Sequence, residues 1–311
     1  MPYQTVSSLH DDAYLTNVSV QFMNEPSRMI ADRLVPMVPV QKESDKFVTF
    51  EKGSWFRNKA ALIADGDAAP EGDYGTSSTT FECFDYGLRS RITERQMANS
   101  DAVMRLATNK AKFTAQHTLL ERELQCATLM FATGNWSNGA VSSAWSNATS
   151  TPVNDIYGAI DYVEDATYGY RANTLVIGIA HFRELRVHPQ IISALYGPGG
   201  SGPTRVTADM LADFFDVDQF LVGFGKYTTV AETATDIDKD DQTNIWGTVF
   251  GAYYVAPTPS LDIPSAAYRF QKRVVTRTYN DEARMKFWVE NRELAVQAQV
   301  ASDCGYLLTA I

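Results

Sequence analysis

The chain has 311 residues, a formal net charge of −10 and a hydrophobic fraction of 45%, which is enough for one large folded domain or two intertwined ones. This acidic balance excludes a general nucleic-acid binder, because phosphate binding depends on Lys and Arg, and no cluster of either stands out. The start lacks a secretory signal and no apolar run approaches the ~20 residues of a membrane span, so the sequence predicts a soluble protein with no membrane partner.

Residues 1–40 are typical of an extended arm. Apolar residues are scattered along them, and three prolines punctuate the second half. Between residues 34 and 40 the apolar residues alternate around two of these prolines, which suits an edge strand or a segment lying on another surface. The arm has too few apolar residues to form a core of its own.

Residues 43–90 are predicted to form a long two-stranded excursion. Residues 46–50 and 79–88 have the composition of strands, and a polar tip at 53–78 lies between them. An isolated hairpin is marginal in water, so apolar side chains on its tip predict that it lies against something else. These side chains are Trp55, Phe56, Leu62 and Ile63.

Residues 101–133 contain neither Pro nor Gly and predict a single α-helix, on the order of 50 Å long at 1.5 Å per residue. Apolar residues recur along it at steps that keep them on one helix face, which predicts a buried stripe. The stripe consists of Val103, Leu106, Phe113, Leu120, Leu124, Ala127 and Phe131. Lys110 and His117 lie on the same stripe and interrupt it. A compact enzyme rarely needs a rod of this length.

A Gly/Ser/Asn-rich connector at 134–151 separates this helix from an α/β pattern. Helices are expected from residue 152, within 181–196 and after residue 207, with strands at 174–180, 217–223 and 246–255. The last part of the chain is β-rich. Strands are expected at 268–278, 283–290, 294–300 and 305–311, with a turn at 279–282.

Catalytic and metal-binding patterns are weak throughout. The four histidines include no HExxH pair and have no Cys or carboxylate at metal-ligand spacing. Residues 236–241 begin like a calcium loop but lack its turn glycine and its final glutamate. The glycine-rich residues 197–202 lack the Lys-Ser/Thr ending of a phosphate-binding loop. The sequence therefore predicts no catalytic residue, no cofactor and no metal site.

The three cysteines, Cys83, Cys126 and Cys304, are odd in number and far apart in the sequence. This spacing fits reduced thiols in a cytosol better than a disulfide framework. Each is expected to be a small buried hydrophobic residue.

The order of these parts resembles a known family. An arm, a long hairpin, one long helix, a compact α/β insertion and a β-rich return follow one another as in the major capsid proteins of tailed bacteriophages, the Hong Kong 97 fold. The segment Met29-Ile-Ala-Asp-Arg-Leu-Val-Pro36 resembles the entry from arm to loop in such proteins, and residues 207–217 resemble their axial-domain helix running into a strand. The resemblance covers nearly the whole chain.

The resemblance implies an α+β fold with an N-terminal arm, an extended β-hairpin loop, a peripheral domain with a long spine helix, and an axial α/β domain. The corresponding ranges are 1–42 for the arm, 43–84 for the extended loop, 85–150 for the peripheral domain with its spine helix at 101–133, 151–265 for the axial domain, 266–302 for strands returning to the peripheral domain, and 303–311 for a terminal strand.

The function implied by the resemblance is that of a major capsid protein, not an enzyme. Copies would assemble as hexamers and pentamers into an icosahedral head shell enclosing double-stranded DNA, without sequence-specific binding. The implied partners are a separate scaffolding protein, a portal and, in some shells, a decoration protein. The location would be the virion, after assembly in the host cytoplasm. Some relatives crosslink Lys to Asn, but no acceptor Asn or activating Glu can be matched to Lys46, Lys52 or Lys59.

Seven residues are predicted to contact neighbouring subunits. Five belong to the hairpin tip (Trp55, Phe56, Arg57, Leu62 and Ile63), and Lys110 and His117 belong to the long helix. Three alternatives to a phage shell stay open on the sequence. They are an encapsulin-like nanocompartment shell, an α/β enzyme with an unrecognised site, and a mostly β tail or adhesion component, which should lack the long helix.

Overall fold

The computed structural model describes residues 29–98, 103–197, 205–230, 241–259 and 263–311. Most of the arm, most of the acidic loop at 236–241 and most of the glycine-rich loop at 197–202 therefore lie outside the described residues. No helix in these ranges is long and apolar enough to cross a membrane. Cys83, Cys126 and Cys304 are all free and buried, as predicted.

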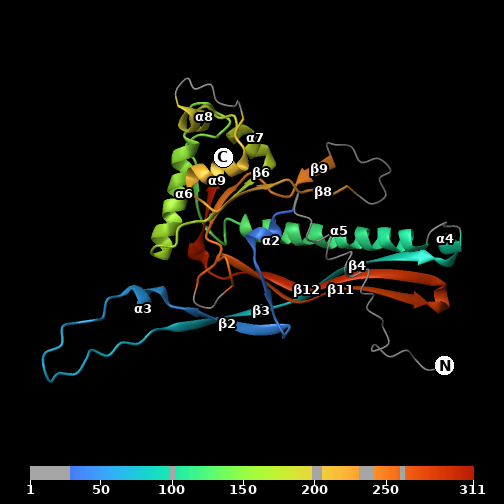
Figure 1. The fold of residues 1–311 in the computed structure, drawn as a ribbon, viewed down its shortest axis with the longest axis horizontal. Coiled ribbons are helices and arrows are strands. Elements are labelled where there is room, and N and C mark those ends of the chain that lie inside the picture. Colours follow the sequence, from blue (N-terminus) through green and yellow to red (C-terminus); the bar gives the residue numbers. More distant parts are fainter. Residues whose placement is uncertain (1–28, 99–102, 198–204, 231–240, 260–262) are drawn as a thin grey trace.

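One long helix lying along a four-stranded sheet forms the first half of the fold (Figure 1). The helix is α5 (Val103–Met130), about 42 Å long at 1.5 Å per residue. The sheet has the order β1-β11-β12-β4, and its strands are β1 (Met37–Pro39), β11 (Ala267–Asp281), β12 (Lys286–Gln299) and β4 (Phe84–Thr93). β12 pairs antiparallel with β11 on one side and with β4 on the other.

The two strands predicted at 283–290 and 294–300 are one continuous strand, β12. The turn also differs from its predicted position at 279–282. β11 continues to Asp281, and the chain reverses through the short 3₁₀ helix Glu282–Arg284 and Met285, whose φ is 49°. Residues 291–293 contain no turn-forming residue other than Asn291. Because Asn291 is buried in the sheet, the strand continues through this segment.

The fully buried face of α5 is offset from the predicted stripe, of which Leu106, Leu120, Leu124 and Phe131 are only partly buried against the core. The members of the fully buried face are spaced three and four residues apart, and most are small or polar: Ala111, Thr114, Ala115, Thr118, Leu119, Arg122, Glu123, Cys126, Ala127 and Met130. Only Ala127 belongs to both sets. Phe113 is 47% exposed and its ring contacts that of His117, so the prediction that Phe113 faces the core was wrong. Short side chains let α5 lie close to β4 and β12, and that close approach selects the face.

Hydroxyl groups on this face are satisfied locally. Thr114 donates its hydroxyl to the carbonyls of Lys110 and Ala111, and Thr118 donates to the carbonyl of Thr114. Asn291 of β12 donates its side-chain amide to the Thr118 hydroxyl over 3.2 Å. Buried polar groups cost little when they are paired in this way, which is why hydroxyl residues are tolerated against the sheet.

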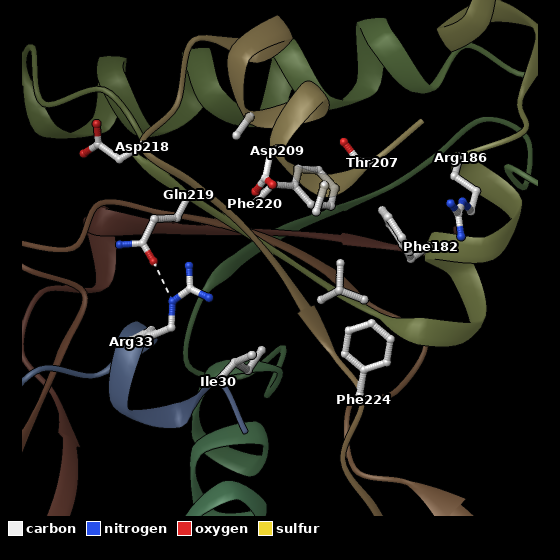
Figure 2. A pocket seen from close by; sticks show the side chains of 13 residues that line it. Ile30, Arg33, Phe182, Arg186, Thr207, Asp209, Asp218, Gln219, Phe220 and Phe224 are labelled. Carbon is white, nitrogen blue, oxygen red and sulfur yellow. Dashed lines mark hydrogen bonds between the residues drawn. The ribbon is translucent and has the colours of Figure 1, made fainter. Parts of the chain in front are cut away.

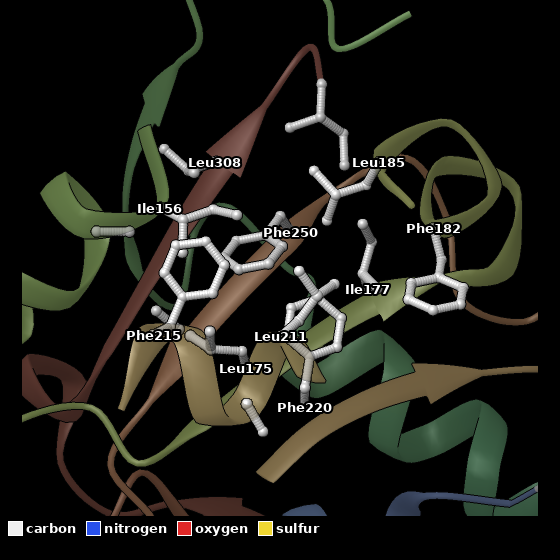
Figure 3. Close-up of a cluster of buried hydrophobic side chains, with 14 of the residues drawn as sticks. Ile156, Leu175, Ile177, Phe182, Leu185, Leu211, Phe215, Phe220, Phe250 and Leu308 are labelled. Carbon is white, nitrogen blue, oxygen red and sulfur yellow. The ribbon is translucent and has the colours of Figure 1, made fainter. Parts of the chain in front are cut away.

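A second, mixed sheet forms the α/β half of the fold and confirms the pattern expected there. Its order is β5-β13-β10-β6-β7, made of β5 (Ser137–Ala140), β13 (Gly305–Thr309), β10 (Phe250–Tyr253), β6 (Thr174–Gly178) and β7 (Gln219–Gly223). The helices of this half are α6 (Pro152–Thr167), α7 (Ile179–Leu185), α8 (Pro189–Tyr196) and α9 (Ala208–Phe215). Figure 3 shows their apolar core, in which Leu211 and Phe215 of α9 face Leu175 and Phe220 of the sheet.

The predicted hairpin projects from the body of the molecule (Figure 1). Its strands β2 (Ser44–Phe50) and β3 (Thr76–Glu82) pair antiparallel from Ser44 opposite Glu82 to Phe50 opposite Thr76. The single strand predicted at 79–88 is divided at Cys83 between β3 and β4, which belong to different sheets. A short helix α3 (Lys52–Phe56) follows β2, and residues 57–75 form neither helix nor strand. The remaining elements are α2 (Ala31–Leu34), α4 (Glu94–Ala98), β8 (Lys226–Thr228), β9 (Gln242–Asn244) and the 3₁₀ helix Ser302–Cys304.

The corrected helix face gives a direct test. We expect Ala115→Asp to lower the free energy of unfolding by about 3 kcal/mol or more, because Ala115 is fully buried and the new carboxylate would have no partner. Phe113→Asp, two residues away and half-exposed, is the matched control and should change it by less than about 1 kcal/mol. Urea unfolding of the unassembled subunit measures both. A larger loss of stability for Phe113→Asp than for Ala115→Asp would show that the stripe predicted from the sequence is the buried face after all.

Candidate assembly surfaces

Glu123 of α5 binds the end of the N-terminal arm. Its carboxylate accepts hydrogen bonds from the backbone N–H of Ile30 (3.0 Å) and Ala31 (2.9 Å) and from the indole Nε1 of Trp246 (2.6 Å). These N–H groups open the short helix α2, so a side chain from another helix takes the place of a local cap. Burial raises the pKa of the Glu123 carboxyl, and the three donors oppose that shift.

Four charged residues form a compact cluster beside this contact, and we call Asp32, Arg122, Arg269 and Glu293 the charge cluster. Arg122 of α5 donates to both oxygens of Asp32 (2.9 and 2.8 Å) and to Glu293 of β12 (2.7 Å). Arg269 of β11 donates to Asp32 (3.3 Å) and also binds Glu293. Each carboxylate therefore bridges both guanidinium groups, and the cluster joins α2, α5, β11 and β12.

Burial dominates the energetics of the charge cluster. Arg122, Arg269 and Glu293 are almost fully buried, whereas the side chain of Asp32 is 48% exposed. Burial lowers the pKa of Arg122, and burial together with the neighbouring Arg122 charge lowers the pKa of Arg269 to about 9. Removing one member of such a cluster is costly, because the remaining charges stay buried without compensation.

The sequence held one overlooked signal for this cluster. Arg122 and Glu123 are adjacent in the middle of a helix, yet neither has an oppositely charged residue three or four positions away on that helix. Their helix neighbours at those positions are apolar, small or uncharged. Unpaired charges in that setting point to partners elsewhere in the chain, but the sequence does not say which ones.

The five predicted hairpin residues are all solvent-accessible. Trp55, Phe56, Arg57, Leu62 and Ile63 are exposed, and Leu62 has its whole side chain in solvent. The ring of Trp55 lies 5.5 Å from that of Tyr74, and the ring of Phe56 stacks on Tyr168 at 4.6 Å. These contacts fix the direction of the rings without covering them.

The base of the hairpin is anchored on the α/β half. Lys52 of α3 donates to the Asp303 carboxylate (2.5 Å) and to the carbonyl of Ala166 at the end of α6 (2.6 Å). Its ammonium group also lies 5.3 Å from the centre of the Tyr168 ring. Together with the stacking of Phe56, this holds α3 in place while residues 57–75 project beyond it.

Lys110 and His117 lie on a different part of the surface. His117 is exposed and contacts Phe113, and Lys110 is half-buried about two turns before His117 on α5. The helix and the hairpin loop extend in opposite directions from the body (Figure 1). The structure thus separates the seven predicted contact residues into two surfaces. Within the described ranges no three His, Cys, Asp or Glu side chains are grouped to hold a metal ion.

Two curated proteins are similar to the chain in sequence. It is 26% identical to the major capsid protein of Burkholderia phage BcepMu, with 96% of each chain covered. It is also 26% identical to the major capsid protein of Pseudomonas phage JBD67, with 68% of each chain covered. No protein-family profile matches the sequence.

Solved structures show the same fold. A phage-related protein of Bordetella bronchiseptica has a TM-score of 0.73 at 21% identity, covering 97% of this chain and 98% of its own. The mature capsid of bacteriophage PhiM1 (TM-score 0.58, 10% identity, 99% and 92% covered) and a virus-like particle of Pyrococcus furiosus (0.59, 12%, 96% and 100%) are also similar. The comparisons confirm the predicted capsid fold and the prediction of a tailed-phage major capsid protein.

We expect Glu293→Met to lower the free energy of unfolding by about 3–5 kcal/mol, because two buried guanidinium groups would then share only the half-exposed Asp32. The control is Glu290→Met on the same strand. Glu290 pairs at 3.2 Å with Arg292, which is itself 43% exposed, and its loss should cost under about 1 kcal/mol. Urea unfolding of the unassembled subunit measures the difference.

The same experiment has a rescue arm. Adding Arg122→Met and Arg269→Met to Glu293→Met removes the uncompensated charges and should recover most of the lost stability. Equal effects for Glu290→Met and Glu293→Met, or no recovery in the triple variant, would contradict the role given to the charge cluster.

Proposed function

We propose that many copies of this chain assemble as hexamers and pentamers into the icosahedral head shell of a tailed phage, which encloses double-stranded DNA. The assembled capsids among the similar structures support homo-oligomeric assembly. The net charge of −10 suits a shell that encloses its DNA without binding the phosphate backbone tightly. The role of the chain is structural rather than catalytic.

The observation that carries this proposal is the exposed loop of the hairpin. Leu62, Ile63 and Trp55 are apolar and exposed on a segment that projects from the subunit, and no described element of the same subunit covers Leu62. A projecting segment with such side chains is stabilised when a neighbour buries them. We therefore assign Trp55, Phe56, Arg57, Leu62 and Ile63 to one contact between subunits, and Lys110 and His117 to a second.

The division of the chain follows from the same proposal. Residues 1–42 serve as the arm, 43–84 as the extended loop, 85–150 and 266–302 as the peripheral domain, and 151–265 with 303–311 as the axial domain. A separate scaffolding protein directs assembly in the host cytoplasm, and a portal occupies one vertex of the finished virion. The capsid relatives support the virion as the location.

A second candidate is a nanocompartment shell that holds a protein cargo. A virus-like particle of Pyrococcus furiosus has a TM-score of 0.59, about that of the PhiM1 capsid, so this fold occurs in a virus-like particle as well as in phage capsids. Both sequence relatives are phage capsid proteins, and this favours the phage shell. The contents of particles purified from the native source distinguish the candidates, because DNA supports the first and a cargo enzyme the second.

Replacing residues 57–75 by a short Gly-Ser linker from Phe56 to Thr76 should leave a folded subunit that forms no stable shell. The strands β2 and β3 and the anchor at Lys52 remain, so we expect the melting temperature of the subunit to change little. Electron microscopy of protein expressed with its scaffold measures assembly. The matched control is Val187→Ser, which removes an exposed apolar side chain from the α/β half. Normal shells from the loop replacement would refute the role given to the hairpin.

A further inference from the structure

A pocket opens on the α/β half beside the start of α2. It lies between α2, α7, α9 and β7, and its volume is about 360 Å³. Apolar side chains form its floor, and polar ones its rim. Figure 2 shows Ile30, Phe182, Phe220 and Phe224 around the opening, with Arg33 bound to Gln219 on one side and Arg186 on the other.

The strand beside the pocket has an open edge. β7 is the last strand of its sheet and pairs in parallel with β6 alone among the described residues. Its side chains alternate, so that Phe220 and Val222 face the pocket and the core under α9, while Leu221 packs toward α2 and Trp246. Such an edge can accept one more extended segment through main-chain hydrogen bonds.

Two features of the pocket suit an uncharged strand. The guanidinium groups of Arg33 and Arg186 are balanced by the carboxylates of Asp209 and Asp218 among the lining residues, so the site has no net charge. Phe224 is 45% exposed at its mouth, although Phe182 and Phe220 beside it are almost covered. An occupant with alternating apolar side chains would cover Phe224 and complete the floor.

The sequence next to the pocket has that pattern. Ile30 lines the pocket, so the described part of the chain begins beside it, and residues 1–28 precede it in the sequence. Residues 16–22 read Thr-Asn-Val-Ser-Val-Gln-Phe, which places Thr16, Val18, Val20 and Phe22 on one side of a strand and Asn17, Ser19 and Gln21 on the other. Residues 13–24 carry no charge, in a chain of which 21% is charged.

We propose that residues 16–22 of the chain's own arm add as a sixth strand to the open edge of β7, with Val18, Val20 and Phe22 over the pocket. The connection from residue 23 to residue 29 spans up to about 25 Å when extended, which is enough to turn back from Ile30 onto the edge. The arm is thereby held at two places, by Glu123 at its end and by β7 before that end. This inference goes beyond the shell function and does not depend on it.

Hydrogen–deuterium exchange of the full-length, unassembled subunit tests the proposal. We expect the backbone amides of 219–223 to exchange at least tenfold faster in Val20→Asp than in the unmodified chain, because a carboxylate over the apolar floor would release the strand. Val6→Asp, an equivalent change outside the segment, is the control and should leave the exchange unchanged. Far-UV circular dichroism verifies that both variants are folded.

A truncation gives the second arm of the test. Removing residues 1–23 should produce the same faster exchange, and a synthetic peptide of residues 12–24 added to the truncated chain should reverse it. Unchanged exchange in both Val20→Asp and the truncation would overturn the proposal. Protection that appears only as the chain concentration rises would assign the strand to the arm of a neighbouring copy and overturn the proposal of the chain's own arm.

Discussion

The buried charge cluster is the constraint on which the arrangement of the subunit depends. Asp32, Arg122, Arg269 and Glu293 come from four elements, and Asp32 and Arg269 are 237 positions apart in the sequence. Charges that leave water must find partners with good geometry, so the cluster forms only when α2, α5, β11 and β12 all reach their final positions. Glu123, next to Arg122 on α5, adds the backbone of the arm and Trp246 to the same junction. One turn of α5 thus connects the end of the arm, the four-stranded sheet and the loop between β9 and β10.

Close packing of α5 on its sheet makes this junction possible. Ala111 and Ala115 have no exposed surface, and from Ala111 to Thr118 the buried face of the helix consists of methyl and hydroxyl groups. A row of larger side chains there would lift α5 away from β4 and β12 and carry the Arg122 guanidinium out of reach of Glu293. The small residues therefore set the distance between helix and sheet, and the ion pairs of the charge cluster require that distance.

Much of the fold could be predicted from residue patterns, and the failures have physical reasons. A run without Pro or Gly defined the helix, and alternation with turn residues defined the hairpin and the terminal strand. The fully buried positions of the helix were missed because a search for large apolar residues finds Phe113, whereas the sheet accepts Ala115 and Thr118. The charge cluster was missed because its members are paired across the chain. The hairpin contact was predicted from aromatic and aliphatic residues on a segment without a core, and the helix contact from Lys110 and His117 interrupting an apolar stripe. Neither signal identifies what each residue touches.

The length and pairing of β12 also affect how the subunit resists mechanical tension. It is 14 residues long and pairs with β11 along nearly its whole length and with β4 over ten positions. Inter-strand hydrogen bonds in antiparallel sheets lie perpendicular to the strands, so tension along β12 is shared by many bonds at once instead of opening them one after another. An outward pressure on a closed shell would stretch its wall in the plane of the subunits. A subunit oriented with β12 along that stretch would resist it with the sheet as a whole.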